Sequence, residues 1–282
     1  MFTPFFLTGA NGRLFALQYS PVEEACRGVI IHVPAFAEEM NKSRHMVSQQ
    51  ARAFAEQGYA TLVFDYYGTG DSEGEFADSN WDIWQQDLLS VIDWCSQHVS
   101  DTVLLWGLRF GALLATSVIA KTKQPIKQLV LWQPVASGEQ YMTQFLRLKL
   151  AGGMMTGASK ETVQDLKAKL DKGETLEVGG YCISQSLYQA VSQQSLMAYD
   201  VSTLTGISWY EVNTKPRSLS PVGQKVVDHW NNQSVPVASY QAVGSQFWSN
   251  QEIVFADELV ELTCQHLLVG KAAEDGGELE RA

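Results

Sequence analysis

The sequence predicts an α/β fold, with a mostly parallel central sheet covered by helices on both faces and a helical cap inserted into it. Short runs of residues are continuously apolar, as in strands that are buried on both sides. These runs alternate with segments of helical periodicity, which is typical of a parallel sheet. A long polar stretch interrupts the alternation once, and the alternation then resumes.

The elements follow one another in a regular order along the chain. Apolar runs at 5–8 and 14–19 flank Asn11-Gly12, which predicts a tight hairpin turn. The later strand-like runs occupy residues 29–33, 59–65, 102–106, 128–132, 207–212 and 237–243. The helical segments occupy residues 43–57, 81–98, 110–121, 221–231 and 250–264.

The polar stretch defines the expected domain organisation. Residues 137–200 are rich in Gln, Lys, Ser and Gly and have a helical pattern, which predicts a cap between two strands of one sheet. We therefore expect a core formed by residues 1–136 and 201–270. Residues 271–282 are acidic and contain glycine, which predicts a disordered tail.

Composition excludes several classes of function. The 282 residues carry a formal net charge of −11, which disfavours binding to nucleic acid or to an anionic membrane surface. No apolar run is long enough to cross a membrane, and the N-terminal residues lack the pattern of a secretion signal. The four cysteines are scattered and lack metal-ligand spacing. We expect a cytoplasmic protein without membrane insertion, metal or cofactor.

One short stretch carries the signature of a specific fold. Residues 106–111, WGLRFG, lie between a strand-like run and a small-residue helix. Their G-x-x-x-G frame is that of the nucleophile elbow in α/β-hydrolases, in which Ser, Cys or Asp occupies the position of Arg109. A D-x-x-G-x-G-x-S-x-G loop at 65–74 and an oxyanion-type loop at 32–44 precede it in the expected order. Together these motifs predict the α/β-hydrolase fold.

Three of these runs narrow the resemblance. FAEEMNKSR at 36–44, YGTGDS at 67–72 and WGLRFGALLA at 106–115 resemble the bacterial family exosortase A system-associated hydrolase 2. The similarity is densest between residues 28 and 120. It implies a protein encoded beside genes for exopolysaccharide production and protein sorting, and the family's name implies hydrolysis.

The residues of a Ser-His-Asp triad are missing at all three expected positions. Arg109 occupies the nucleophile position, and its guanidinium stays protonated and cannot attack a carbonyl. The loops at 213–220 and 133–138, where the acid belongs, contain no carboxylate. Gln246 takes the place of the histidine, and none of the five histidines is a good candidate for the base. The sequence therefore predicts that serine-type catalysis is absent.

An arginine at the elbow suggests a binding role instead. It would stand at the N-terminus of a helix, where free N–H groups favour anions, and its planar fork suits a carboxylate or phosphate. The expected ligand-binding residues are Arg109, Phe110, Phe36, Glu38, Glu39 and Phe247. Alternatively, Glu38 or Glu39, expected on the neighbouring loop, pairs with Arg109 and fills the site without a ligand.

Three functions remain open. The first is an accessory protein that binds a small anionic or acyl ligand, or a partner protein. The second is an active hydrolase of ester or acyl bonds in which Glu38 or Glu39 activates water, with Arg109 as electrophile. The third is a purely structural partner of a related hydrolase. The expected associations are with a partner protein or with further copies of the chain.

Overall fold

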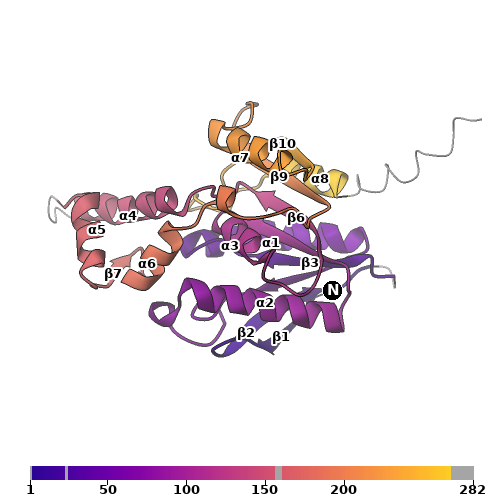
Figure 1. The fold of residues 1–282 in the computed structure, drawn as a ribbon, viewed down its shortest axis with the longest axis horizontal. Helices are drawn as coiled ribbons and strands as arrows, with labels where there is room; N and C mark the ends of the chain where they lie inside the picture. Colours follow the sequence, from indigo (N-terminus) through magenta and orange to yellow (C-terminus); the bar gives the residue numbers. More distant parts are fainter. Residues whose placement is uncertain (1, 23–24, 156–160, 268–282) are drawn as a thin grey trace, which may run out of the picture.

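An eight-stranded, mostly parallel sheet forms the centre of the molecule (Figure 1). The computed structural model describes residues 2–22, 25–155 and 161–267. The strands lie in the order β1-β2-β4-β3-β5-β6-β9-β10. Their bounds are β1 Phe2–Thr8, β2 Arg13–Tyr19, β3 Gly28–Val33, β4 Tyr59–Phe64, β5 Val103–Leu108, β6 Ile126–Trp132, β9 Gly206–Asn213 and β10 Val237–Val243.

The antiparallel part of the sheet is confined to its first edge. β1 and β2 form the predicted hairpin, in which Thr8 pairs with Arg13 and Gly9 N donates to Gly12 O at 2.8 Å. β2 also runs antiparallel to β4, while the strands from β4 to β10 are parallel to their neighbours. The predicted α/β-hydrolase architecture is therefore confirmed.

Both faces of the sheet are buried. Successive residues of one strand enter different cores: Val29 and Ile31 pack into one, and Ile30 packs into the other. Helices α1 and α8 cover one face, and α2, α3 and α7 cover the opposite face. Their bounds are α1 Glu38–Glu56, α2 Trp81–His98, α3 Phe110–Val118, α7 Pro221–Asn231 and α8 Asp257–His266.

Two helices begin elsewhere than the sequence predicts. α8 begins at Asp257, seven residues later than expected. α1 begins at Glu38, so Glu38 and Glu39 lie in the first helical turn and the prediction that they belong to a loop is wrong. The residue before α1 is Ala37, which has no side chain to cap the helix. The usual sequence signal for a helix start is therefore missing.

The chain between β6 and β9 lies at one end of the molecule (Figure 1). It contains α4 Gly138–Met155, α5 Val163–Asp171 and α6 Gln185–Ser192. It also contains a small hairpin, β7 Leu176–Val178 and β8 Tyr181–Ile183, which a purely helical segment would lack. Two short 3-10 helices, Phe76–Asp78 and Leu196–Ala198, complete the elements.

Two further expectations concern the chain as a whole. The predicted tail at 271–282 lies outside the described residues. Among the helices that the structure does describe, none combines the length and the apolar character needed to cross a membrane.

Candidate functional site

The elbow after β5 has the backbone of a nucleophile turn. Arg109 has φ 54° and ψ −116°, a backbone conformation that residues other than glycine rarely adopt. Its N–H donates to Trp132 O at 2.9 Å, and its carbonyl accepts from Val135 N at 3.1 Å. A Cβ atom at Gly111 would lie 2.0 Å from Val33 O. The turn is thus fixed by close backbone packing, whatever side chain stands at its tip.

The side chain of Arg109 forms an ion pair with Glu39. Arg109 Nη2 donates to Glu39 Oε1 at 3.0 Å, and Nε lies 3.3 Å from both carboxylate oxygens. Glu38 pairs instead with Lys42, at 3.4 Å. Of the two glutamates expected to compete for Arg109, Glu39 is therefore its partner.

Two aromatic residues complete the surroundings of this pair. The hydroxyl of Tyr141, on α4, donates to Glu39 Oε2 at 2.9 Å. The guanidinium carbon of Arg109 lies 5.8 Å from the centre of the Tyr141 ring and 5.3 Å from that of Trp248. These distances allow cation–π attraction. The side chains of Arg109 and Glu39 remain 17% and 16% exposed, so the pair is mostly shielded from water.

Burial and charge oppose each other at this pair. Desolvation by burial lowers the pKa of Arg109, but the nearby charges of Glu39 and Tyr141 and the hydrogen bond to Glu39 outweigh it, and the pKa is raised. Burial, together with the charge of Glu39, raises the pKa of Tyr141 well above its ordinary value. Arg109 is therefore a cation and Tyr141 a neutral hydrogen-bond donor at physiological pH.

Two cavities meet at the elbow. The larger, of about 300 Å³, lies on the α1 side, and the smaller, of about 180 Å³, lies toward β9; both are lined by Arg109, Tyr141 and Gln144. Apolar side chains form much of the larger cavity: Phe36, Phe145, Leu148 and Trp248. Its charged residues are Glu38, Glu39, Lys42 and Arg109, whose formal charges cancel. The larger cavity therefore suits a largely apolar ligand without net charge.

Four of the six residues expected to bind a ligand line this larger cavity: Phe36, Glu38, Glu39 and Arg109. Phe110 and Phe247 do not. Both are fully buried, Phe110 against Trp81 and Phe247 against Trp132.

The loop after β10 contributes a different residue from the one expected. Gln246 is exposed and lines neither cavity, and its carbonyl accepts a hydrogen bond from Ser249 N at 3.1 Å. Trp248 faces Arg109 in its place. No histidine of the described chain lines either cavity.

Sequence reasoning missed one carboxylate near the elbow. Glu211 lines the smaller cavity from within β9, whereas the acid was expected in the loop at 213–220 or in the loop at 133–138. Glu211 accepts hydrogen bonds from Ser220 N at 2.9 Å, Ser220 Oγ at 2.7 Å and Trp209 Nε1 at 3.2 Å. Ser220 is the N-cap of α7, so this buried carboxylate anchors the start of a helix. The signal for it was a single acidic residue inside an otherwise buried strand.

Among the residues that the structure describes, the acidic, histidine and cysteine side chains form no cluster suited to a metal. Within residues 2–22, 25–155 and 161–267, no group of three His, Cys, Asp or Glu side chains is placed to hold a metal ion. The free cysteines are also dispersed, and burial raises the pKa of Cys95 far above its ordinary value. Arg109 and the aromatic residues thus remain the distinctive groups of the site.

Comparison with known structures supports the fold. Est1E from Butyrivibrio proteoclasticus, solved with bound ferulic acid, is similar with a TM-score of 0.68 and 17% identity over 95% of this chain and 99% of that one. The α/β hydrolase domain-containing protein 10 from mouse has a TM-score of 0.61 and 17% identity over 96% of this chain and 99% of that one. At these identities the likeness concerns the fold alone.

Curated relatives match over a shorter region. An uncharacterized 31.7 kDa protein of the traX-finO intergenic region of Escherichia coli is 33% identical over 96 residues, a third of each chain. The mitochondrial palmitoyl-protein thioesterase ABHD10 of Rattus norvegicus is 27% identical over 117 residues, which are 41% of this chain and 37% of the relative. The matched region therefore spans well under half of these relatives.

A family model covers more of the chain. The model for serine aminopeptidase S33 matches residues 24–204, more than half of the 282 residues. It is broader than the exosortase-associated group that the motifs resemble, so that narrower assignment stays a prediction. The matched range includes β3, β4, β5 and the elbow at Arg109. The chain therefore belongs to the serine aminopeptidase S33 family of α/β-hydrolases.

Proposed function

We propose that this protein is a non-catalytic member of its hydrolase family that binds an acyl-bearing ligand in the larger elbow cavity. The observation that carries the proposal is the ion pair between Arg109 and Glu39 at the position of the nucleophile. A serine-type mechanism requires a nucleophile that can lose its proton to a histidine. A guanidinium cannot supply one, and within the described chain no histidine lines the cavity.

The remaining hydrogen-bond donors of Arg109 favour a neutral carbonyl as ligand group. A guanidinium has five N–H groups. Three of them donate, at Nε and Nη2 to Glu39 and at Nη1 to Gln133 O, which leaves two. Because Glu39 already balances the charge, an anionic ligand would have to displace it. A carbonyl oxygen accepts from the two free N–H groups without that cost.

The walls of the cavity favour an acyl chain. Phe36, Phe145 and Trp248 are buried or nearly so, and Leu148 is 47% exposed at the cavity's edge. Burying an alkyl chain against such side chains is favourable by about 0.8 kcal/mol per methylene group. An ester, thioester or amide of an aliphatic acid combines this chain with the carbonyl.

One relative agrees with this class of ligand. ABHD10 is named a palmitoyl-protein thioesterase, and a palmitoyl thioester is an aliphatic acyl compound. The resemblance to exosortase A system-associated hydrolase 2 suggests the setting, an accessory role in bacterial exopolysaccharide production or protein sorting. A partner protein in that system would bind the ligand-bound form of this protein.

A water-activating mechanism is the alternative. Glu39 would be the base, but its carboxylate accepts hydrogen bonds from Arg109 and Tyr141, which compete with an attacking water. Glu38 is paired with Lys42. Both glutamates are thus engaged, which favours binding over turnover.

Two measurements test the proposal. The first is turnover of p-nitrophenyl butyrate and octanoate by the wild type and by Arg109→Ala. We expect no turnover above buffer in either. Turnover by the wild type that is lost in Arg109→Ala would overturn the non-catalytic assignment and favour the water-activating mechanism.

The second measurement is calorimetric binding of octanamide, a neutral acyl probe that cannot be confused with an anion. We expect saturable binding that Leu148→Asp weakens at least tenfold, because the new carboxylate lies at the cavity's edge. Met197→Asp is the matched control, since Met197 is similarly exposed at 45% and lines neither elbow cavity. Equal binding by wild type and Leu148→Asp, or none by the wild type, would overturn the assignment of the cavity.

A further inference from the structure

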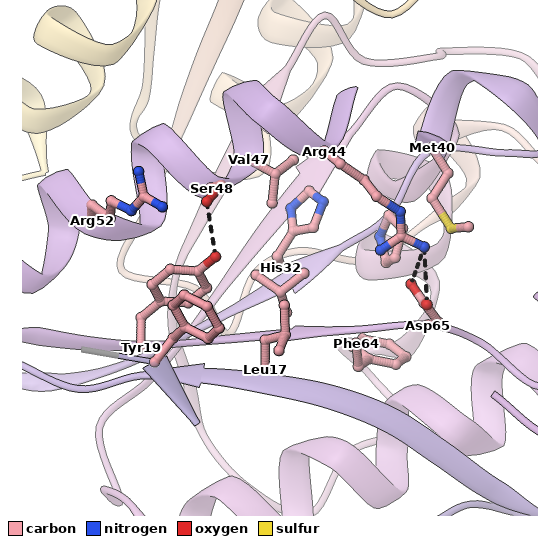
Figure 2. A pocket seen from close by; sticks show the side chains of 13 residues that line it. Leu17, Tyr19, His32, Met40, Arg44, Val47, Ser48, Arg52, Phe64 and Asp65 are labelled. Carbon is pink, nitrogen blue, oxygen red and sulfur yellow. Dashed lines mark hydrogen bonds and ion pairs between the residues drawn. The ribbon is translucent and has the colours of Figure 1, made fainter. Parts of the chain in front are cut away.

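A separate cavity lies between α1 and the sheet (Figure 2). Its volume is about 270 Å³, and side chains from α1, β2, β3 and β4 line it. It shares no lining residue with either cavity at the elbow. Nothing in the proposed function makes use of it.

The polar groups of this second cavity gather at its two ends. Arg52, Ser48 and Tyr19 lie at one end, and the Arg44–Asp65 pair lies at the other (Figure 2). Between the ends the walls are mainly apolar, with Leu17, Val47 and Val63 among the lining residues. A ligand that fills this space has an apolar body and at least one polar end.

The charges of the second cavity favour an anion. Its lining contains two guanidiniums, of Arg44 and Arg52, and one carboxylate, of Asp65. Asp65 is engaged with Arg44, whose Nη2 donates to it at 3.1 and 3.0 Å, and it also accepts from Asp71 N at 3.0 Å. Arg52 has no ion pair or hydrogen bond to any described residue. A positively charged lining is notable in a chain with a net charge of −11.

A free hydroxyl donor stands beside Arg52. Tyr19 Oη and Ser48 Oγ are 3.0 Å apart, and either oxygen can be the donor. Two hydroxyls have two hydrogens, and the bond between them uses one, so the other can be donated to a ligand. A guanidinium together with a hydroxyl donor is a suitable partner for a carboxylate group.

His32 places an imidazole ring against this cavity. Its ring lies in the middle of the cavity (Figure 2), and the residue is only 3% exposed. Its Nδ1 atom is buried without a hydrogen-bond partner. An unsatisfied buried polar atom usually destabilises a fold by about 1–3 kcal/mol. Because Nδ1 has almost no accessible surface, the ring lines the cavity through its other atoms.

We propose that this second cavity binds a medium-chain carboxylate. The carboxylate group meets Arg52 and the Tyr19–Ser48 hydroxyls, and the alkyl chain packs against Leu17, Val47 and Val63. The protein thus has an anion-binding cavity in addition to the neutral acyl site at the elbow.

Octanoate is the probe, and the imidazole resonances of the five histidines in nitrogen-15 NMR spectra are the readout. We expect the His32 resonance, assigned with His32→Gln, to shift saturably as octanoate is added. Arg52→Gln should weaken the affinity about tenfold, because it removes a charge-assisted hydrogen bond. The matched control is Arg217→Gln, since Arg217 is also exposed but lies outside the cavity.

Each outcome decides the proposal. A His32 resonance that does not move, or an affinity that Arg52→Gln leaves unchanged, would overturn it. Leu148→Asp keeps this test separate from that of the elbow cavity. It should reduce octanamide binding and leave the octanoate affinity unchanged, because the two cavities share no residue.

Discussion

Replacing Glu39 by Gln should destabilise the protein more than replacing its partner Arg109 by Met. Glu39→Gln leaves a guanidinium that is 17% exposed and stands at the N-cap of α3, where the helix dipole opposes a cation. Arg109→Met leaves a carboxylate in the first turn of α1, where the dipole favours an anion. The structure thus predicts an unequal effect of the two substitutions.

The magnitudes follow from the burial of the pair. Removing one partner of a fully buried ion pair destabilises a protein by about 3–5 kcal/mol. The 17% and 16% exposure of these side chains places Glu39→Gln near the lower end. We expect about 3 kcal/mol for Glu39→Gln and about 2 kcal/mol for Arg109→Met. The double variant leaves no unpaired charge and should lose only about 2 kcal/mol, so the coupling is about 3 kcal/mol.

Urea unfolding followed by tryptophan fluorescence measures these free energies. The chain contains eight tryptophans, and Trp248 lies against Arg109. Wild type, both single variants and the double variant form one double-mutant cycle. Additive losses, with a coupling below about 0.5 kcal/mol, would show that the ion pair contributes nothing and would refute the reasoning.

Three further predictions concern His32 and the elbow. Burial, opposed by a hydrogen bond with the Trp106 backbone and reinforced by Arg44, lowers the pKa of His32 from 6.5 to about 3. Below pH 6.5 His32 is therefore protonated in the unfolded chain and neutral in the folded chain. The free energy of unfolding should fall as pH drops below about 6.5, by about 2 kcal/mol at pH 5. Urea unfolding at several pH values should show this loss in the wild type and its absence in His32→Gln; equal pH dependence would contradict it. Arg109→Gly should be about 1 kcal/mol more stable than Arg109→Ala in the same assay, because φ is 54°, and an advantage for Ala would be inconsistent with the strained turn. Gly111→Ala should lower stability by about 2–3 kcal/mol, because its Cβ would lie 2.0 Å from Val33 O, whereas Gly152→Ala, with no atom within 4 Å, should not; a neutral Gly111→Ala would argue against the close packing.

The elbow was predictable because its geometry depends on residue types that are visible in the sequence. Gly107 and Gly111 approach neighbouring backbone so closely that a side chain at either would collide. The partner of Arg109 was not predictable in the same way. It depends on where α1 begins, because the first residue of the helix sets the direction in which each glutamate points. The sequence does not mark that start, since Ala37 has no capping side chain. The sequence thus left Glu38 and Glu39 equivalent, and the helix decides between them.

Other features were missed for different reasons. The β7–β8 hairpin is joined by Gly179-Gly180, both with positive φ, which is a signal that the polar composition of the segment obscured. Glu211 is in the strand, and the expectation of an acid was limited to the loops at 213–220 and 133–138. The cavity around His32 arises where α1 crosses β2, β3 and β4, and such crossings depend on side-chain packing that no local pattern encodes.

The hydrogen bond from Tyr141 to Glu39 joins the inserted segment to α1. Tyr141 belongs to α4, and Glu39 belongs to α1 and holds Arg109 at the elbow. One carboxylate therefore joins the first turn of α4 to the tip of the elbow, and Arg109 and Tyr141 depend on the same side chain for their position. Any change at Glu39 is felt both at the former nucleophile position and at the start of the inserted segment, two regions that are about 30 residues apart along the chain.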